Sequence, residues 1–180
     1  MTFLKTILAA AAIAGFATSA TAQDTGAYGT LGGDYVNVEG FDTITVTGRL
    51  GYNFTENFAV EGQAAFGIID DSFDEVVEGV AVEANAGVNN SFAGFFKAGL
   101  PLDGGLEVFA RVGYHFTEFG ASAEAEGLTV SDSDSTDGIA VGAGGQYFFD
   151  NANGVRLEYT LFDGEGGNAD VISLSYVRKF

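Results

Sequence analysis

His115 is the only histidine of the chain and the first residue to consider for chemistry. A histidine can activate a serine hydroxyl when an acidic side chain orients the imidazole. His115 falls on the polar side of an alternating segment, and no serine stands beside it there. We therefore interpret His115 as a hydrogen-bond partner inside the fold. We predict no catalytic residue, no resident metal and no cofactor.

Two acidic segments could collect Ca²⁺ or Mg²⁺, since both ions prefer oxygen ligands. Their spacing differs from the Asp-x-Asp-x-Asp-Gly pattern with a later Glu that is typical of an EF-hand. We interpret both segments as solvated connections, with weak cation binding as the alternative. The candidate ligands are Asp70, Asp71, Asp74 and Glu75 in the first segment and Asp132 and Asp134 in the second.

Eight further charged residues share one property, which is that each alternates with apolar neighbours along the chain. Alternation with period 2 is typical of a strand that has one apolar and one polar side. Four cations and four carboxylates on such polar sides could pair with one another, each with a neighbour on the next strand. The eight are Asp34, Arg49, Glu61, Lys97, Glu107, Arg111, Arg156 and Glu158.

Eight alternating segments carry these residues, and we predict that each is a β-strand. The segment 106–117 is the clearest, because Leu106, Val108 and Val112 alternate with Glu107 and Arg111. An alternating run over 80–90 could extend the fourth strand. The predicted strands are 27–38, 43–54, 58–68, 91–100, 106–117, 138–149, 155–162 and 169–180.

The predicted connections alternate in length. Residues 55–57, 101–105 and 150–154 form short turns, whereas residues 69–79 and 118–137 form longer acidic connections. Short turns at one end and longer loops at the other are typical of an outer-membrane barrel. We therefore predict an all-β fold, an eight-stranded antiparallel up-and-down transmembrane barrel.

The distribution of apolar residues indicates which side of the barrel faces lipid. The apolar sides carry large residues with aromatic residues near the turns, as in an interfacial girdle. The cations lie on the opposite side, and a lipid-facing Arg or Lys would cost roughly 2–4 kcal/mol at the midplane. We predict a lumen filled by ion-paired side chains. The predicted girdle residues are Phe54, Phe58, Leu106, Phe149, Tyr159 and Phe180.

Both ends of the sequence carry export features. Residues 1–22 combine a short basic start, an Ala-rich apolar run and a small-residue cleavage site before Gln23, as in a secretory signal peptide. We expect residues 23–180 to form the barrel. The last strand ends on an aromatic residue, and its alternating apolar residues predict an insertion signal at Leu174, Tyr176 and Phe180.

Composition excludes several classes of protein. The chain of 180 residues has a formal net charge of −18, whereas a nucleic-acid-binding protein needs a basic surface. It has no cysteine, and therefore no disulfide framework. The 27 glycines and 17 phenylalanines, beside a single proline, favour an all-β chain.

The order of several short motifs resembles the small eight-stranded outer-membrane β-barrel family related to the OmpA transmembrane domain. The motifs are residues 49–54, 109–115 and 156–159 and the final Phe180. The resemblance implies a location in the outer membrane of a Gram-negative bacterium, contact with its lipid, and insertion by the barrel-assembly machinery. We expect a monomer that binds no nucleic acid.

Four functions fit these expectations. The first is a structural barrel with a charged, side-chain-filled lumen and acidic extracellular loops. The second is a small porin-like diffusion channel, and the third is a surface adhesion or binding module. The fourth is a soluble periplasmic barrel that holds a ligand inside.

Overall fold

The computed structural model describes residues 25–38, 41–69, 71–77, 80–125, 128–164 and 167–180. The predicted signal peptide, residues 1–22, lies outside the described residues. Strands account for nearly all of the described chain: β1 (Gly26–Val38), β2 (Phe41–Asn53), β3 (Phe58–Ile69), β4 (Asp71–Val77), β5 (Val80–Pro101), β6 (Leu106–Ala125), β7 (Leu128–Phe148), β8 (Asn153–Gly164) and β9 (Gly167–Lys179).

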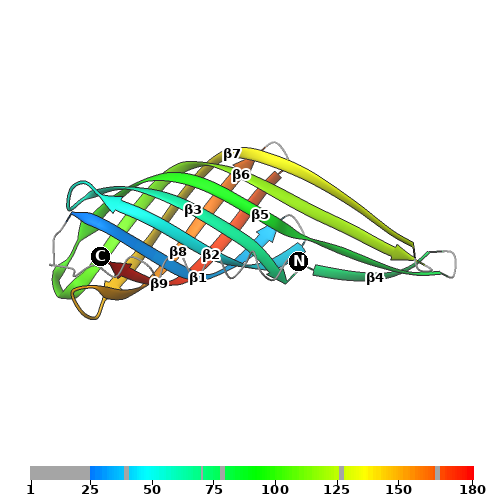
Figure 1. The fold of residues 1–180 in the computed structure, drawn as a ribbon, viewed down its shortest axis with the longest axis horizontal. Coiled ribbons are helices and arrows are strands. Elements are labelled where there is room, and N and C mark those ends of the chain that lie inside the picture. Colours follow the sequence, from blue (N-terminus) through cyan, green and yellow to red (C-terminus); the bar gives the residue numbers. More distant parts are fainter. Residues whose placement is uncertain (1–24, 39–40, 70, 78–79, 126–127, 165–166) are drawn as a thin grey trace.

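Eight of these strands close into an antiparallel barrel (Figure 1). The ring consists of β1–β3 and β5–β9, and each of these strands pairs with the next one in the ring. β3 pairs with β5, because β4 lies outside the ring, and β1 pairs with β9 to close it. The predicted eight-stranded barrel is therefore confirmed. No helix among the described residues is long and apolar enough to cross a membrane.

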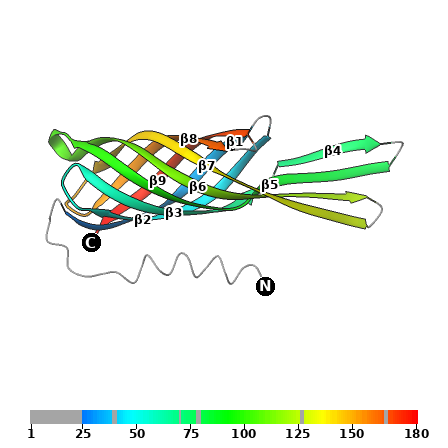
Figure 2. The same ribbon diagram turned by 90° about the horizontal axis from the view of Figure 1, so that it is seen from above.

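Two predicted connections are wrong, because they are strands. Residues 71–77 form β4, which pairs with the first part of β5, and residues 118–125 and 128–137 continue β6 and β7 as paired strands. These parts extend well beyond the barrel at one end (Figure 2). The composition indicated a loop because Ser, Asp and Glu disfavour strands that must bury a face, whereas a hairpin in water needs no buried face.

A β-bulge marks the point where β5 leaves the barrel. The pairing with β6 skips Asn89, since Val88 pairs with Phe119 and Asn90 with Glu118. Bulges are common at barrel rims, where one extra residue bends a strand without ending it. The sequence indicated that an alternating run over 80–90 could extend the fourth strand past this position. The structure shows that the strand continues through it.

Three tight turns connect the strands at the opposite end, which we call the turn end. Residues 54–57, 102–105 and 149–152 form them, and the second includes a short 3₁₀ turn over Asp103–Gly105. Gly104 and Gly105 have φ angles of 77° and 83°, a region that glycine adopts without steric cost. The end with the longer hairpins is called the loop end.

The strands alternate between a lumen side and an outer side. Along β9, Leu174 is 64 % exposed, whereas Ser173 and Ser175 on either side of it are 1 % and 4 % exposed. The same alternation runs along β8. Large apolar side chains therefore point outward, as in a barrel surrounded by lipid.

Aromatic side chains gather on the outer side near the turn end. Phe54, Phe58 and Phe96 form one cluster, with ring centroids 5.6–6.4 Å apart. Near the loop end, the hydroxyl groups of Tyr114 and Tyr159 donate to Asp137 and Asp170. Four of the predicted girdle residues, Phe54, Phe58, Leu106 and Phe149, are exposed at the turn end, and Tyr159 is exposed toward the loop end. Phe180 is half-buried beside the start of β1.

Candidate functional site: the charged lumen

The centre of the lumen holds Arg156, a fully buried side chain of β8. Its guanidinium contacts two carboxylates. Arg156 Nη1 and Nη2 donate to Glu61 at 2.6 and 3.2 Å, and Nε and Nη2 donate to Glu158 at 2.8 and 2.5 Å. Four charge-assisted hydrogen bonds around one arginine offset the cost of burying three charges.

Arg111 of β6 joins the same two carboxylates from another side. Its Nη1 lies 3.4 Å from Glu61 and donates to Gln63 at 3.1 Å. Its Nη2 pairs with Glu158 and donates to Thr160 at 2.9 Å. Glu61 and Glu158 are therefore both shared between Arg111 and Arg156.

Arg49 of β2 completes the cluster. Its Nη2 donates to Glu158 at 3.1 Å and to Ser173 at 3.2 Å, and its Nε donates to Gln63 at 2.8 Å. Asp34 lies farther from this guanidinium, at 3.9 Å. A second ion pair lies nearer the turn end, where Lys97 donates to Glu107 at 2.7 Å and Gln146 donates to the same carboxylate at 2.8 Å.

Aromatic rings on the lumen side cover two of the guanidinium groups. Arg111 lies over the ring of Phe95 at 3.8 Å from its centroid, and Arg156 lies over Phe109 at 4.1 Å. Such cation–π contacts strengthen when the cation is shielded from water. The ring of Phe109 fits against Gly144 of β7, where a Cβ would lie only 2.7 Å from Phe109 Cζ. Gly144 therefore makes room for the lumen side chain of Phe109.

All eight charged residues predicted for the lumen lie there, and the structure joins them in seven ion pairs. Their formal charges cancel, four cations against four carboxylates. One detail of the expectation is wrong. Two pairs join adjacent strands, Lys97 with Glu107 and Arg49 with Asp34, and Arg156 pairs with Glu158 of its own strand. The other four pairs skip at least one strand, because arginine side chains are long enough to pass the neighbouring strands.

Sequence reasoning missed several polar partners of this network. Tyr28 donates to Glu61 at 2.5 Å, Gln63 accepts from Arg49 and Arg111, and Thr47 donates to Asp34. Tyr28, Gln63 and Thr47 each lie an even number of residues from a charged residue on the same strand, and therefore on the same side of it. This even spacing could have identified them as lumen residues.

Comparisons with known proteins agree with this architecture. The sequence matches the family described as "Outer membrane protein beta-barrel domain" over residues 8–180. The chain belongs to this family. It is an outer-membrane protein with a transmembrane β-barrel. No curated protein matches the chain in sequence.

Several solved structures share the fold of this outer-membrane barrel. Ail of Yersinia pestis, solved with the heparin analogue sucrose octasulfate, has a TM-score of 0.61 at 15 % identity, covering 88 % of this chain and 100 % of Ail. The N-terminal β-barrel domain of Pseudomonas aeruginosa OprF has a TM-score of 0.57 at 12 % identity, covering 87 % and 99 %. OprG of the same organism has a TM-score of 0.55 at 11 % identity, covering 86 % and 96 %.

His115 of this outer-membrane barrel is buried on the lumen side, toward the loop end. Its Nδ1 lies 3.1 Å from Thr117 Oγ1 and its Nε2 lies 3.3 Å from the carbonyl oxygen of Asp163. The ring also packs edge-on against Phe162, with centroids 5.0 Å apart. His115 is thus a hydrogen-bonded lumen residue, and the absence of catalysis stays a prediction.

The predicted cation-binding residues are only partly described. Asp70 lies outside the described residues, as do the side chains of Asp71, Asp74, Glu75 and Asp132. Asp134 is exposed and accepts from the backbone N–H of Ser135 at 2.8 Å. Within the described part of the chain, no three His, Cys, Asp or Glu side chains gather as a metal site would require.

The residues of the predicted insertion signal lie on β9 and just beyond it. Leu174 and Tyr176 point outward, and the hydroxyl group of Tyr176 donates to Asn153. The backbone N–H of Phe180 donates to the carbonyl oxygen of Ala27 at 2.9 Å, which ties the end of the chain to β1. Their role in insertion stays a prediction.

Proposed function

We propose that this protein is a structural component of the outer membrane whose lumen is closed by its own side chains. The observation that carries the proposal is the buried cluster of Arg49, Arg111 and Arg156 around Glu61 and Glu158. An eight-stranded barrel has an interior just wide enough for side chains to fill. Ion pairs that reach from wall to wall leave little room for a water path.

The direction of insertion follows from the connections. Short turns lie on the periplasmic side of outer-membrane barrels and longer loops on the outside. On this basis the turn end faces the periplasm, and the hairpins of β4–β5 and β6–β7 extend from the cell. In the same proposal, residues 1–22 are removed on export. The barrel-assembly machinery reads Leu174, Tyr176 and Phe180, and the barrel acts as a monomer.

Swelling of vesicles tests closure of the lumen. Liposomes loaded with dextran and carrying the refolded protein are diluted into an isotonic pentose solution, and the change in turbidity is followed. A closed barrel leaves the vesicles as tight as protein-free ones. Swelling that grows with the amount of native protein would favour the diffusion channel instead.

A surface-binding module is the second candidate, because four strands continue beyond the barrel as a sheet with two free edges. Among the described residues, β4 pairs only with β5, and residues 128–137 of β7 pair only with β6. A free strand edge can accept a strand from a partner. Such a partner would dock by backbone hydrogen bonds along the extended hairpins.

The charge of the sequence indicates which partners this surface would attract. Both long hairpins lie in stretches of the sequence without basic residues: residues 50–96 and 112–155 contain no Lys or Arg. The ligand of Ail in its solved complex is a polysulfated heparin analogue. The acidic hairpins would repel such a polyanion, so we propose a basic protein surface as the matching partner.

Adhesion tests this second candidate. Cells that display the chain are compared with cells that display a form without residues 70–86 and 118–137, on surfaces coated with lysozyme or with heparin. Binding to lysozyme that is lost with the hairpins, while the barrel still resists heat in gel electrophoresis, supports a surface module. Preferential binding to heparin would contradict the proposed partner class.

A further inference from the structure

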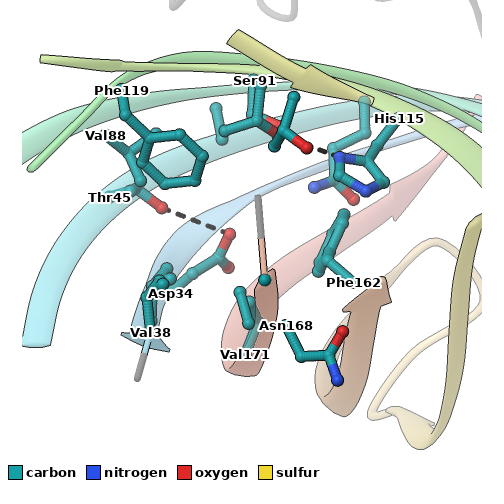
Figure 3. A pocket seen from close by; sticks show the side chains of 17 residues that line it. Asp34, Val38, Thr45, Val88, Ser91, His115, Phe119, Phe162, Asn168 and Val171 are labelled. Atoms are coloured by element: carbon teal, nitrogen blue, oxygen red, sulfur yellow. Dashed lines mark hydrogen bonds between the residues drawn. The ribbon is translucent and has the colours of Figure 1, made fainter. Parts of the chain in front are cut away.

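A cavity of about 60 Å³ lies in the lumen on the loop-end side of the ion pairs (Figure 3). Asp34 and Gln63 form its floor, next to Arg49 of the central cluster. His115 and Phe162 stand at its side, and Asn168, an exposed residue, lies at its rim. The cavity therefore opens toward the loop end and ends at a buried carboxylate.

Asp34 is the least well paired of the four lumen carboxylates. It is 3 % exposed, and its Oδ2 accepts from the hydroxyl groups of Thr45 and Thr47. Its Oδ1 has no hydrogen-bond partner among the described residues. Arg49 lies 3.9 Å from Oδ1, but the same Nη2 donates to Glu158 at 3.1 Å and to Ser173 at 3.2 Å.

A buried carboxylate oxygen that accepts no hydrogen bond favours binding of a ligand that carries both a hydrogen-bond donor and a positive charge. Figure 3 shows the Asp34 side chain pointing into the cavity, with Val38 and Val171 beside it. The remaining walls are largely apolar, and they include Val36, Val88 and Phe162. The site thus offers one carboxylate at its floor and a mostly apolar wall, to which Thr45, Ser91 and Thr117 also contribute.

These surroundings distinguish between kinds of cation. Ca²⁺ and Mg²⁺ take six or more oxygen ligands, with carboxylates prominent among them, whereas this cavity has a single carboxylate among hydroxyl, amide and apolar side chains. A primary ammonium ion with a short alkyl chain matches both parts, since its N–H groups donate to oxygen and its carbon atoms contact the apolar walls. The volume suits a group of only a few heavy atoms, because an apolar cavity that holds benzene measures roughly 150 Å³.

We propose that this cavity binds a small primary alkylammonium ion, with its ammonium group on Asp34 Oδ1. The charge at this end of the barrel favours a cation, because every charged residue that the structure describes at the loop-end rim is acidic. These residues are Asp42, Glu118, Asp137, Asp163 and Asp170. A binding site at the loop end goes beyond the structural role proposed above, which needs only the ion pairs below Asp34.

Titration with ethylammonium chloride tests the site in the full barrel. The ¹⁵N-labelled protein in detergent micelles is titrated, and the amide shifts of Thr45, Ser91 and Asn168 are followed at constant ionic strength maintained with NaCl. Saturable shifts at these amides are expected. The apparent dissociation constant should rise at least tenfold in Asp34→Asn and stay unchanged in Glu56→Gln, which removes an exposed carboxylate at the turn end, away from the cavity.

A second variant keeps the test valid if Asp34→Asn fails to fold. Ala65→Leu keeps the carboxylate but adds three carbon atoms to the cavity wall from β3, and it too should weaken binding at least tenfold. Shifts that do not saturate, that NaCl alone reproduces, or that persist undiminished in either lumen variant would overturn the proposal.

Discussion

Arg156 and Glu61 form an ion pair across the full width of the barrel. Arg156 lies on β8 and Glu61 on β3, and three strands separate these two in either direction around the ring. Arg156 Nη1 nevertheless donates to Glu61 Oε1 at 2.6 Å. One pair of side chains thus joins opposite walls of the barrel.

Removing the charge of Glu61 should destabilise the barrel strongly. Glu61→Gln leaves Arg156 and Arg111 with one shared carboxylate, and breaking a buried ion pair costs about 3–5 kcal/mol. Urea unfolding in phospholipid vesicles measures the change in the free energy of unfolding. Glu56→Gln, in an exposed turn, is the matched control. Equal stability of the two variants would show that the buried pair contributes nothing.

A charge on the outer side should be costly in proportion to its depth. Leu174 points outward from the middle of β9, and we expect Leu174→Arg to lower the free energy of unfolding by roughly 2–4 kcal/mol. Leu102→Arg, in a turn, should cost about 0–1 kcal/mol, because it lies near the interface. Unfolding in vesicles of defined lipid compares the two. A larger penalty at Leu102 would contradict the predicted position of the membrane.

The glycine of β7 that faces Phe109 should not tolerate a methyl group. Gly144→Ala would place its Cβ 2.7 Å from Phe109 Cζ and closer still to the carbonyl oxygen of Leu157, and such overpacking costs about 1–3 kcal/mol. Gly62→Ala is the control, since a Cβ on Gly62 meets no atom within 4 Å. Heat-shifted gel mobility gives the midpoint of unfolding for each variant. The fit between β7 and Phe109 is disproved if both alanines have the same midpoint.

The turn at Asp150 predicts a pH effect outside the membrane. The side chain of Asn153, then the backbone N–H groups of Ala152 and Asn153, donate to the Asp150 carboxylate and hold its pKa below the ordinary value. Stability from a carboxylate with a lowered folded-state pKa is complete above the unfolded pKa of about 3.9 and is lost as pH falls through the folded pKa.

Asp150→Ala should therefore unfold at lower urea than the native protein at pH 7, and the difference should shrink as the pH falls below about 4. Unfolding midpoints at pH 7, 4 and 2 measure this difference. Asp103→Ala, at another turn of the same end, removes a carboxylate of the same type as a control. A difference that stays constant down to pH 2 would mean that the Asp150 bonds do not depend on ionisation.

The alternation of residue types was enough to predict which side chains face the lumen. Arg49, Lys97, Arg111 and Arg156 each stand next to an apolar residue of the opposite side, and all four are buried in the barrel. The partners of the arginines were not predictable. Arg156 and Glu61 are 95 residues apart, and their meeting depends on the register and closure of all eight strands.

The hairpins beyond the barrel were missed for a different reason. Residues 71–77 and 118–137 have no single apolar side that lipid would select, so their pattern resembled a solvated loop. Backbone pairing with a neighbouring strand holds them as strands instead. The cavity above Asp34 was also beyond sequence reasoning, because it is lined by residues from all eight strands of the barrel.

Single-channel recording in a planar bilayer tests the closed lumen most directly. The native protein, Arg111→Ala and Arg178→Ala are compared, since Arg178 is an exposed cation outside the lumen. We predict no steady conductance for the native protein or for Arg178→Ala, and open events for Arg111→Ala, which removes one of the cross-lumen links. Steady conductance of the native protein at the level of Arg111→Ala would contradict a lumen closed by ion pairs.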